Sequence, residues 1–233
     1  MKKLRLLTGA LVAGGCVAAQ ATLYTYDFEN INALIPDINY SGYVNEQEVP
    51  NLFTLGANDT SEIVNVSVRL SLSGGFNGDL YGYLVGPNGG FAVLLNRVGK
   101  TATDVFGYSD AGLTIKLDDG GTYGDIHTYQ EVSGYGTKIG DGSSWAPDGR
   151  ETDPDAVVET DARTALLSSF NGFGADGKWT LFLADVGFGE QSTLVSWGLD
   201  IAVVPEPVTW GLLVFAGLAG TRKLFTLRKS RTV

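Results

Sequence analysis

Residues 63–72 read Ile-Val-Asn-Val-Ser-Val-Arg-Leu-Ser-Leu, and their side chains alternate between apolar and polar. A period of two with many β-branched residues is typical of a β-strand that buries one face. The sequence therefore predicts a half-buried strand here, with Asn65 and the other polar residues facing solvent. The side chains predicted to face the core are Val64, Val66, Val68, Leu70 and Leu72.

Similar apolar runs follow along the chain, separated by glycine-rich turns. The turn at Gly86–Gly90 lies between two such runs and predicts a hairpin. Only residues 161–168 look helical. Short strands without long helices favour an all-β fold, a sandwich of two sheets. The other predicted strands cover residues 80–85, 91–95, 113–117, 179–183 and 195–203, the last with Val195, Trp197, Leu199, Ile201 and Val203 on one face.

The N-terminus has the three parts of a secretory signal peptide. Basic residues precede an apolar run from Leu6 to Ala13, and Ala19 and Ala21 form an Ala-x-Ala cleavage site. Residues 1–21 are therefore expected to be removed, so that the mature chain begins at Thr22 without the single cysteine. Lipidation of Cys16 is the alternative, although the preceding Ala-Gly-Gly lacks the leucine that is usual before a lipidated cysteine.

The C-terminus, residues 205–233, also has three parts. A turn motif is followed by the apolar stretch Val208–Gly220 and then by a basic tail. Thirteen helical residues span about 20 Å, which is short of the ~30 Å hydrocarbon core. We expect a short hydrophobic helix that inserts transiently into a membrane; a permanent tail anchor and a buried helix are the alternatives. The turn motif consists of Val204, Pro205, Glu206 and Pro207.

This C-terminus resembles the PEP-CTERM sorting signal of Gram-negative bacteria that make extracellular polysaccharide. The resemblance rests on the turn motif, on Trp210-Gly211-Leu212-Leu213, on Gly217-Leu218 and on the basic tail. It implies an exosortase-type sorting enzyme as a partner. It also implies export through the inner membrane and, after C-terminal processing, a place at the cell surface or outside the cell.

The region between the two signals, residues 22–204, is strongly acidic. It contains 8 Lys and Arg against 25 Asp and Glu, which gives a formal charge of −17. Such a surface repels nucleic acid and anionic membranes, and it attracts divalent cations or basic partners. With 183 residues and no cysteine, this region is large enough for one domain that is held together by its core.

The same region resembles the P domain (Homo B domain) that follows the catalytic domain of subtilisin-like proprotein convertases. The resemblance runs from about Ile35 to Val203. It rests on residues 64–68, 78–80, 84–89, 94–95, 166–170, Gly172, residues 177–181, Asp185 and residues 196–199, in that order. The resemblance implies a jelly-roll sandwich and an association with serine endopeptidases. It departs at the Gly74 turn, where many family members carry a histidine, and through the acidic insert from Asp118 to Asp161.

The sequence predicts no catalytic or cofactor-binding residues. A serine-peptidase triad needs a base, and His127 is the only histidine. There is no Gly-x-Ser-x-Gly motif around a nucleophile, and Ser143 and Ser144 only partly match the serine loop of subtilases. We therefore expect a structural histidine and no enzyme. The chain also lacks the Cys and His clusters that would bind zinc.

Calcium is the one ion for which the sequence offers ligands, because it prefers carboxylate oxygens. The acidic insert holds two groups of carboxylates, neither of which has the spacing of an EF-hand. Solvated loop charge is the alternative interpretation. The candidate ligands are Asp118, Asp119 and Asp125 in the first group, and Asp148, Asp153 and Asp155 in the second.

Three functions are compatible with these features. The first is a non-catalytic structural or adhesive protein of the cell surface or the extracellular matrix. The second is an accessory domain for a separately encoded serine endopeptidase. The third is a lectin-like module that binds surface polysaccharide, with Trp145 or Tyr129 as a stacking platform. Exposure of Trp145 would favour the lectin, and its burial would weaken that hypothesis.

Overall fold

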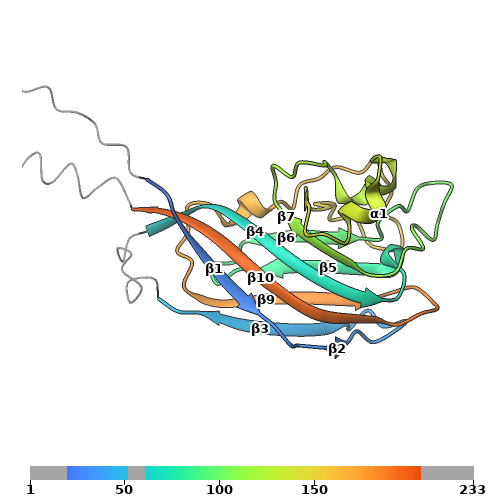
Figure 1. The fold of residues 1–233 in the computed structure, drawn as a ribbon, viewed down its shortest axis with the longest axis horizontal. Helices are drawn as coiled ribbons and strands as arrows, with labels where there is room; N and C mark the ends of the chain where they lie inside the picture. The colour runs from blue at the N-terminus through green and yellow to red at the C-terminus, as the bar shows by residue number, and fades with distance from the viewer. Residues whose placement is uncertain (1–19, 52–60, 206–233) are drawn as a thin grey trace, which may run out of the picture.

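The computed structural model describes residues 20–51 and 61–205, which form two layers of β-sheet (Figure 1). Within these ranges the helices are short, namely η2 (Asn77–Asp79), η3 (Ile126–Glu131), α1 (Tyr135–Lys138) and η4 (Leu167–Phe170). The strands are β1 (Thr22–Phe28), β2 (Ala33–Leu34), β3 (Tyr43–Val49), β4 (Ser61–Gly74), β5 (Leu80–Val85), β6 (Phe91–Asn96), β7 (Leu113–Leu117), β8 (Ser144–Trp145), β9 (Gly177–Asp185) and β10 (Ser192–Pro205).

The strand order is that of a jelly roll. One sheet runs β1-β10-β4-β7-β8, with β2 also paired to β10, and the other runs β3-β9-β5-β6. Leaving out the two-residue strands, the first strand pairs with the last, the second with the seventh, the third with the sixth and the fourth with the fifth, all antiparallel. This is the pattern of a long hairpin rolled into two sheets, so the predicted all-β sandwich is confirmed.

Two β-bulges change the predicted faces of the longest strands. In β4, Val64 is the extra residue opposite Ala202 and Val203, so Ile63 is buried and Val64 is exposed. In β10, Val195 is the extra residue, and Leu194 is buried in its place. A bulge shifts the alternation by one residue. The prediction that Val64 and Val195 face the core was therefore wrong.

The ends of the sandwich coincide with the predicted processing sites. Strand β1 begins at Thr22, and Thr22 pairs with Val203 near the end of β10. Both strands therefore enter or leave the sandwich at the same end, to the left in Figure 1. Of the predicted signal residues, Ala21, Val204 and Pro205 are described. The remaining signal residues are Ala19, Glu206 and Pro207. They and the predicted C-terminal helix lie outside the described residues.

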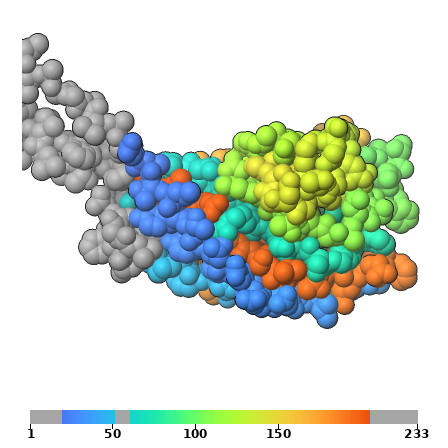
Figure 2. All heavy atoms as spheres, in the orientation of Figure 1, coloured from blue at the N-terminus to red at the C-terminus, as the bar shows by residue number. Residues whose placement is uncertain are grey.

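The acidic insert is folded against the first sheet. It contains η3, α1 and β8, and β8 pairs in parallel with β7. Figure 2 shows the insert, coloured yellow-green to yellow, as a raised mass on this side of the sandwich. Ile126, Tyr129 and Trp145 carry its apolar contacts into the common core. In the described ranges, no helix is long and apolar enough to cross a membrane.

Candidate functional site

His127 lies in η3 and is completely buried. Its Nδ1 lies 2.7 Å from Oδ2 of Asp148, and its Nε2 lies 2.9 Å from the carbonyl oxygen of Lys100. Both partners are acceptors, so both ring nitrogens donate and the imidazole carries a proton on each. A doubly protonated ring has no lone pair with which to accept a proton from a serine. The geometry therefore supports the prediction of a structural histidine.

The charges around His127 favour this protonated form. Burial alone would lower the pKa of His127. The hydrogen bond and negative charge of Asp148, together with the Lys100 carbonyl, outweigh burial and raise the pKa of His127 above its ordinary value. The ring thus forms a buried ion pair with Asp148.

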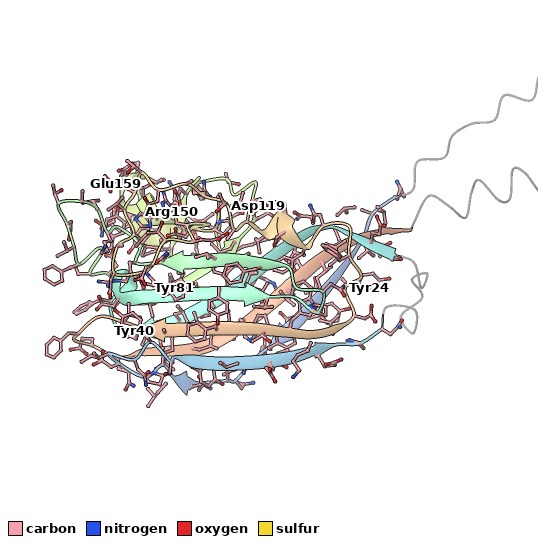
Figure 3. All side chains as sticks on the ribbon, turned by 180° about the vertical axis from the view of Figure 1, so that it is seen from behind. Tyr24, Tyr40, Tyr81, Asp119, Arg150 and Glu159 are labelled. Carbon is pink, nitrogen blue, oxygen red and sulfur yellow. The ribbon has the colours of Figure 1, made fainter. Side chains whose placement is uncertain are left out.

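Arg150 extends this pair into a cluster. Its Nη1 lies 3.2 Å from Oδ1 of Asp148, and its Nη2 lies 2.8 Å from Oδ2 of Asp125. Nη2 also donates to the carbonyl of Glu159 at 2.7 Å, and Figure 3 labels both of these residues on the insert. We call His127, Asp148, Arg150 and Asp125 the buried ion cluster. It ties three parts of the insert together, which is a structural task.

Two of the predicted calcium ligands belong to this cluster, and two others hold backbone and side chains elsewhere. Asp118 accepts hydrogen bonds from Ser67 Oγ at 2.6 Å and Asn65 Nδ2 at 3.1 Å. Asp119 accepts from two backbone N–H groups at the start of η4, those of Leu167 and Ser168. These carboxylates are therefore already engaged, each with a different part of the sandwich.

The last two candidates lie in an exposed loop. Asp153 accepts from the backbone N–H of Asp155, and Asp155 accepts from the hydroxyl of Tyr40 at 2.5 Å. Within residues 20–51 and 61–205, no group of three or more His, Cys, Asp and Glu side chains could hold a metal ion. The structure thus does not bring the six predicted ligands together.

This arrangement predicts the same response to calcium and magnesium. We expect equal concentrations of the two ions to raise the melting temperature by the same amount, because each only screens the −17 charge of the body. Thermal unfolding in matched chloride salts measures this. A shift specific to calcium that disappears in the double variant Asp148→Asn, Asp153→Asn would contradict the prediction.

Neither of the proposed stacking residues is available at the surface. Trp145 and Tyr129 are both 0% exposed. Trp145 packs against Tyr123 and Tyr129 at ring-centroid distances of 5.4 and 6.3 Å, and its Nε1 donates to the carbonyl of Lys138. Neither ring can therefore serve as the stacking platform of the lectin alternative, and the burial of Trp145 weakens that hypothesis.

A cavity that no sequence pattern predicted lies at the end of the sandwich remote from Thr22. It has a volume of about 440 Å³ and is formed by the loops β2–β3, β4–β5, β6–β7 and β9–β10. Phe106 and Phe188 are 75% and 86% exposed at its rim. The side chains of Asp79 and Arg97, both almost fully buried, line it as an ion pair 3.5 Å apart. We call this cavity the loop-end pocket.

A glycine contributes to the shape of the loop-end pocket. A Cβ on Gly187 would lie 2.0 Å from the carboxyl group of Asp79, so no other residue fits there without moving that carboxylate. Gly187 and Gly189 flank Phe188, and this Gly-Phe-Gly triplet was the one available sign that an aromatic ring is held on an open loop. The pattern alone did not indicate that four loops meet around it.

The fold and these sites define the class of protein as an all-β jelly roll with an acidic insert and a loop-end pocket. No family model matches the chain, and no curated protein matches it. Among solved structures, the chain is similar to the serine protease of Aeromonas sobria in complex with its chaperone, at 16% identity and a TM-score of 0.40 over 79% of this chain. The same protease alone gives 18% identity and a TM-score of 0.39 over 78% of this chain. In both cases the match covers 27% of the other chain.

Proposed function

We propose that this chain is an exported, non-catalytic β-sandwich that acts as a structural or adhesive module at the cell surface or in the extracellular matrix. A PEP-CTERM-like signal delivers it there, with an exosortase-type enzyme as its processing partner. The sandwich itself, from Thr22 to Val204, is the part that remains outside the cell. Its function is to present a surface and not to carry out a reaction.

The observation that carries this proposal is the placement of the two ends. Thr22 pairs with Val203, so the predicted signal-peptide site and the sorting motif lie beside each other at one end of the sandwich. The loops that line the loop-end pocket, with Phe106 and Phe188 at its rim, join the strands at the opposite end of the sandwich (Figure 1). A molecule held by its C-terminus would therefore direct this pocket away from the point of attachment.

The environment of His127 supports the non-catalytic part of the proposal. Both ring nitrogens donate to fixed acceptors, and the side chain is buried. Ser144, the serine nearest to a subtilase-like pattern, lies in β8, where its neighbour Trp145 is part of the core. A reaction that needs a histidine base would have to break the buried ion cluster first.

Intact-mass analysis of the protein isolated from its native host tests the proposed delivery. We expect a chain that begins at Thr22 and ends near Pro205 to Pro207. The first site precedes β1 and the second lies at the end of β10, beyond Val203, so processing leaves the pair of Thr22 and Val203 intact. Recovery of only the full-length chain, with Val233 present, would contradict C-terminal processing. A mass that corresponds to a chain with a lipid on Cys16 would contradict the predicted cleavage after Ala21.

A second candidate is an accessory role for a separately encoded serine endopeptidase. The observation that favours it is the jelly-roll strand order, which the P-domain resemblance implies. The same native preparation distinguishes the two roles. A serine endopeptidase that co-purifies in equal amount and loses activity when the sandwich is removed would support the accessory role, whereas polysaccharide in the preparation without a peptidase would support the adhesive one.

A further inference from the structure

Several large apolar side chains are exposed around the loop-end pocket. Ile38, Val105, Phe106 and Phe188 are all more than half exposed, and they come from three different loops. Single exposed apolar residues are common, but a contiguous group marks a site of interaction. A cavity of about 440 Å³ between them is large enough to accept one or two side chains of a partner.

The loops around the pocket are held in place by polar contacts below the rim. Arg97 Nε donates to the carbonyl of Gly78 at 2.5 Å, and Nη2 donates to that of Val105. Arg97 has a φ of 50°, which a residue with a side chain rarely adopts, so its contacts keep it there. Asp104 accepts from the backbone N–H of Phe106. The apolar rim is therefore presented by an ordered frame.

The surroundings of the pocket are acidic. Asp37 lies close enough to Asp79 to act on its carboxyl group, Asp104 shares the loop of Phe106, and Glu190 is exposed two residues after Phe188. Arg97 is the cation that lines the pocket. The nearby Lys100 is buried and donates to two carbonyls of the insert. An approaching partner therefore meets apolar side chains within a negative field.

We infer that the loop-end pocket docks a segment of a partner protein that carries an aromatic or leucine side chain next to lysine or arginine. The inference rests on the proposed adhesive role and names the partner chemistry of this end of the molecule. A second copy of the chain would bring an equally acidic end, and an anionic membrane would be repelled in the same way. A basic segment with an apolar anchor matches both the rim and the charge.

Peptide binding to the protein isolated from its host tests this inference. The probe is a fluorescent peptide with Phe-Leu at its centre and two lysines on each side. One comparison peptide replaces the lysines by glutamates, and another replaces Phe-Leu by Ser-Ser. By fluorescence anisotropy, we expect the lysine peptide to bind at least tenfold more tightly than either comparison peptide. We also expect its affinity to fall as salt rises, because surface charges are screened.

Matched variants locate the binding site. The double variant Phe106→Ser, Phe188→Ser should weaken binding of the lysine peptide at least tenfold. The control is Leu23→Ser with Leu34→Ser, two leucines that are similarly exposed but do not line the pocket; it should leave the affinity unchanged. All four positions are exposed, so both variants should remain folded.

Each of the following four outcomes would overturn the inference. Equal affinity for the lysine and glutamate peptides would show that charge does not contribute to binding. An unchanged affinity of the Phe106→Ser, Phe188→Ser variant would show that the peptide does not bind at the pocket. Binding of phosphatidylcholine vesicles or dimer formation, if lost in that variant, would assign the pocket to lipid or to a second copy. A failure of peptide binding leaves the expected mass of the processed chain unchanged, so it is distinguishable from a failure of the proposed delivery.

Discussion

Replacing Asp148 by alanine is expected to lower the free energy of unfolding by about 3–5 kcal/mol, which is the usual cost of removing one partner from a buried ion pair. Asp148 is fully buried between His127 and Arg150, so the variant leaves His127 without its carboxylate and Arg150 with Asp125 alone. For a domain of this size, the loss corresponds to a fall in melting temperature of roughly 6–20 °C. Denaturant or thermal unfolding of the processed protein measures it.

The control for this variant is Asp176→Ala. Asp176 is exposed, and its carboxyl group makes no hydrogen bond or ion pair in the described part of the chain. The two variants remove the same charge from an acidic protein, so a general effect of net charge would appear in both. We expect Asp176→Ala to change stability by less than about 0.5 kcal/mol. Equal effects of the two variants would show that the cluster contributes nothing specific.

The same cluster gives stability a pH dependence. The pKa of His127 is raised in the folded state, whereas in the unfolded chain it is about 6.5. A raised pKa stabilises the fold fully below about pH 6.5, and this contribution is lost as the pH rises through the folded value. The difference in stability between the wild type and His127→Gln should therefore be largest below pH 6.5 and should shrink in alkaline buffer. A difference that grows with pH would contradict a doubly protonated ring.

Replacing Trp145 by alanine is the second variant with a large expected effect. Trp145 fills the contact between the insert and the sandwich, beside Tyr123 and Tyr129. Removing so large a buried side chain leaves a cavity and should cost about 3–5 kcal/mol. Thermal unfolding measures the loss. A ring that serves only to stack on sugars would instead leave stability unchanged when it is removed.

Phe188→Ala provides the matched control for Trp145→Ala. Phe188 is also a large aromatic residue, but it lies in a loop and is exposed at the rim of the loop-end pocket. Its removal should change stability by less than about 0.5 kcal/mol. If Trp145→Ala were as mild as Phe188→Ala, the insert would not depend on this ring for its attachment to the core.

Most strands with apolar alternation were predicted, but β1 was missed, although Tyr24, Tyr26 and Phe28 alternate with polar residues in it and pack against the core. Strands β4, β5, β6, β7, β9 and β10 all match runs that alternate or stay apolar. Strand β3 was missed because Asn45 and Gln47 face inward on it. Asn45 accepts a hydrogen bond from Trp197 Nε1 at 2.8 Å, and Gln47 donates to Asn45. A polar side chain that finds a partner inside the protein does not appear in a hydrophobic pattern.

The bulges illustrate a second limit. Val64 and Val195 continue the apolar alternation of their strands, yet each is the extra residue opposite a partner strand. Bulges depend on how two distant strands fit together, and neither strand contains that information by itself. The residue that gains the core position, Ile63 or Leu194, is equally apolar, so the composition of the strand gives no warning.

The candidate sites were harder to predict than the fold because carboxylates serve many purposes. Asp118 and Asp119 looked like a pair of metal ligands, but they bind different partners, one in β4 and the other at η4. The loop-end pocket had no sequence pattern because its four loops meet only when the sheets close. Convergence of distant loops is a property of topology, and a single sequence read in order does not contain it.

The position of β10 between β1 and β4 sets the order in which the molecule can be completed. A chain that emerges N-terminus first has no partner for β1, and one side of β4 stays unpaired, until residues 192–205 arrive. The pairing of β1 with β10 joins residues far apart in the sequence and is therefore slow. The unpaired edges of β1 and β4 can associate with other chains during that time. The last strand, β10, has fourteen residues. The first sheet therefore cannot be completed until this segment, at the C-terminal end of the folded region, is available for pairing.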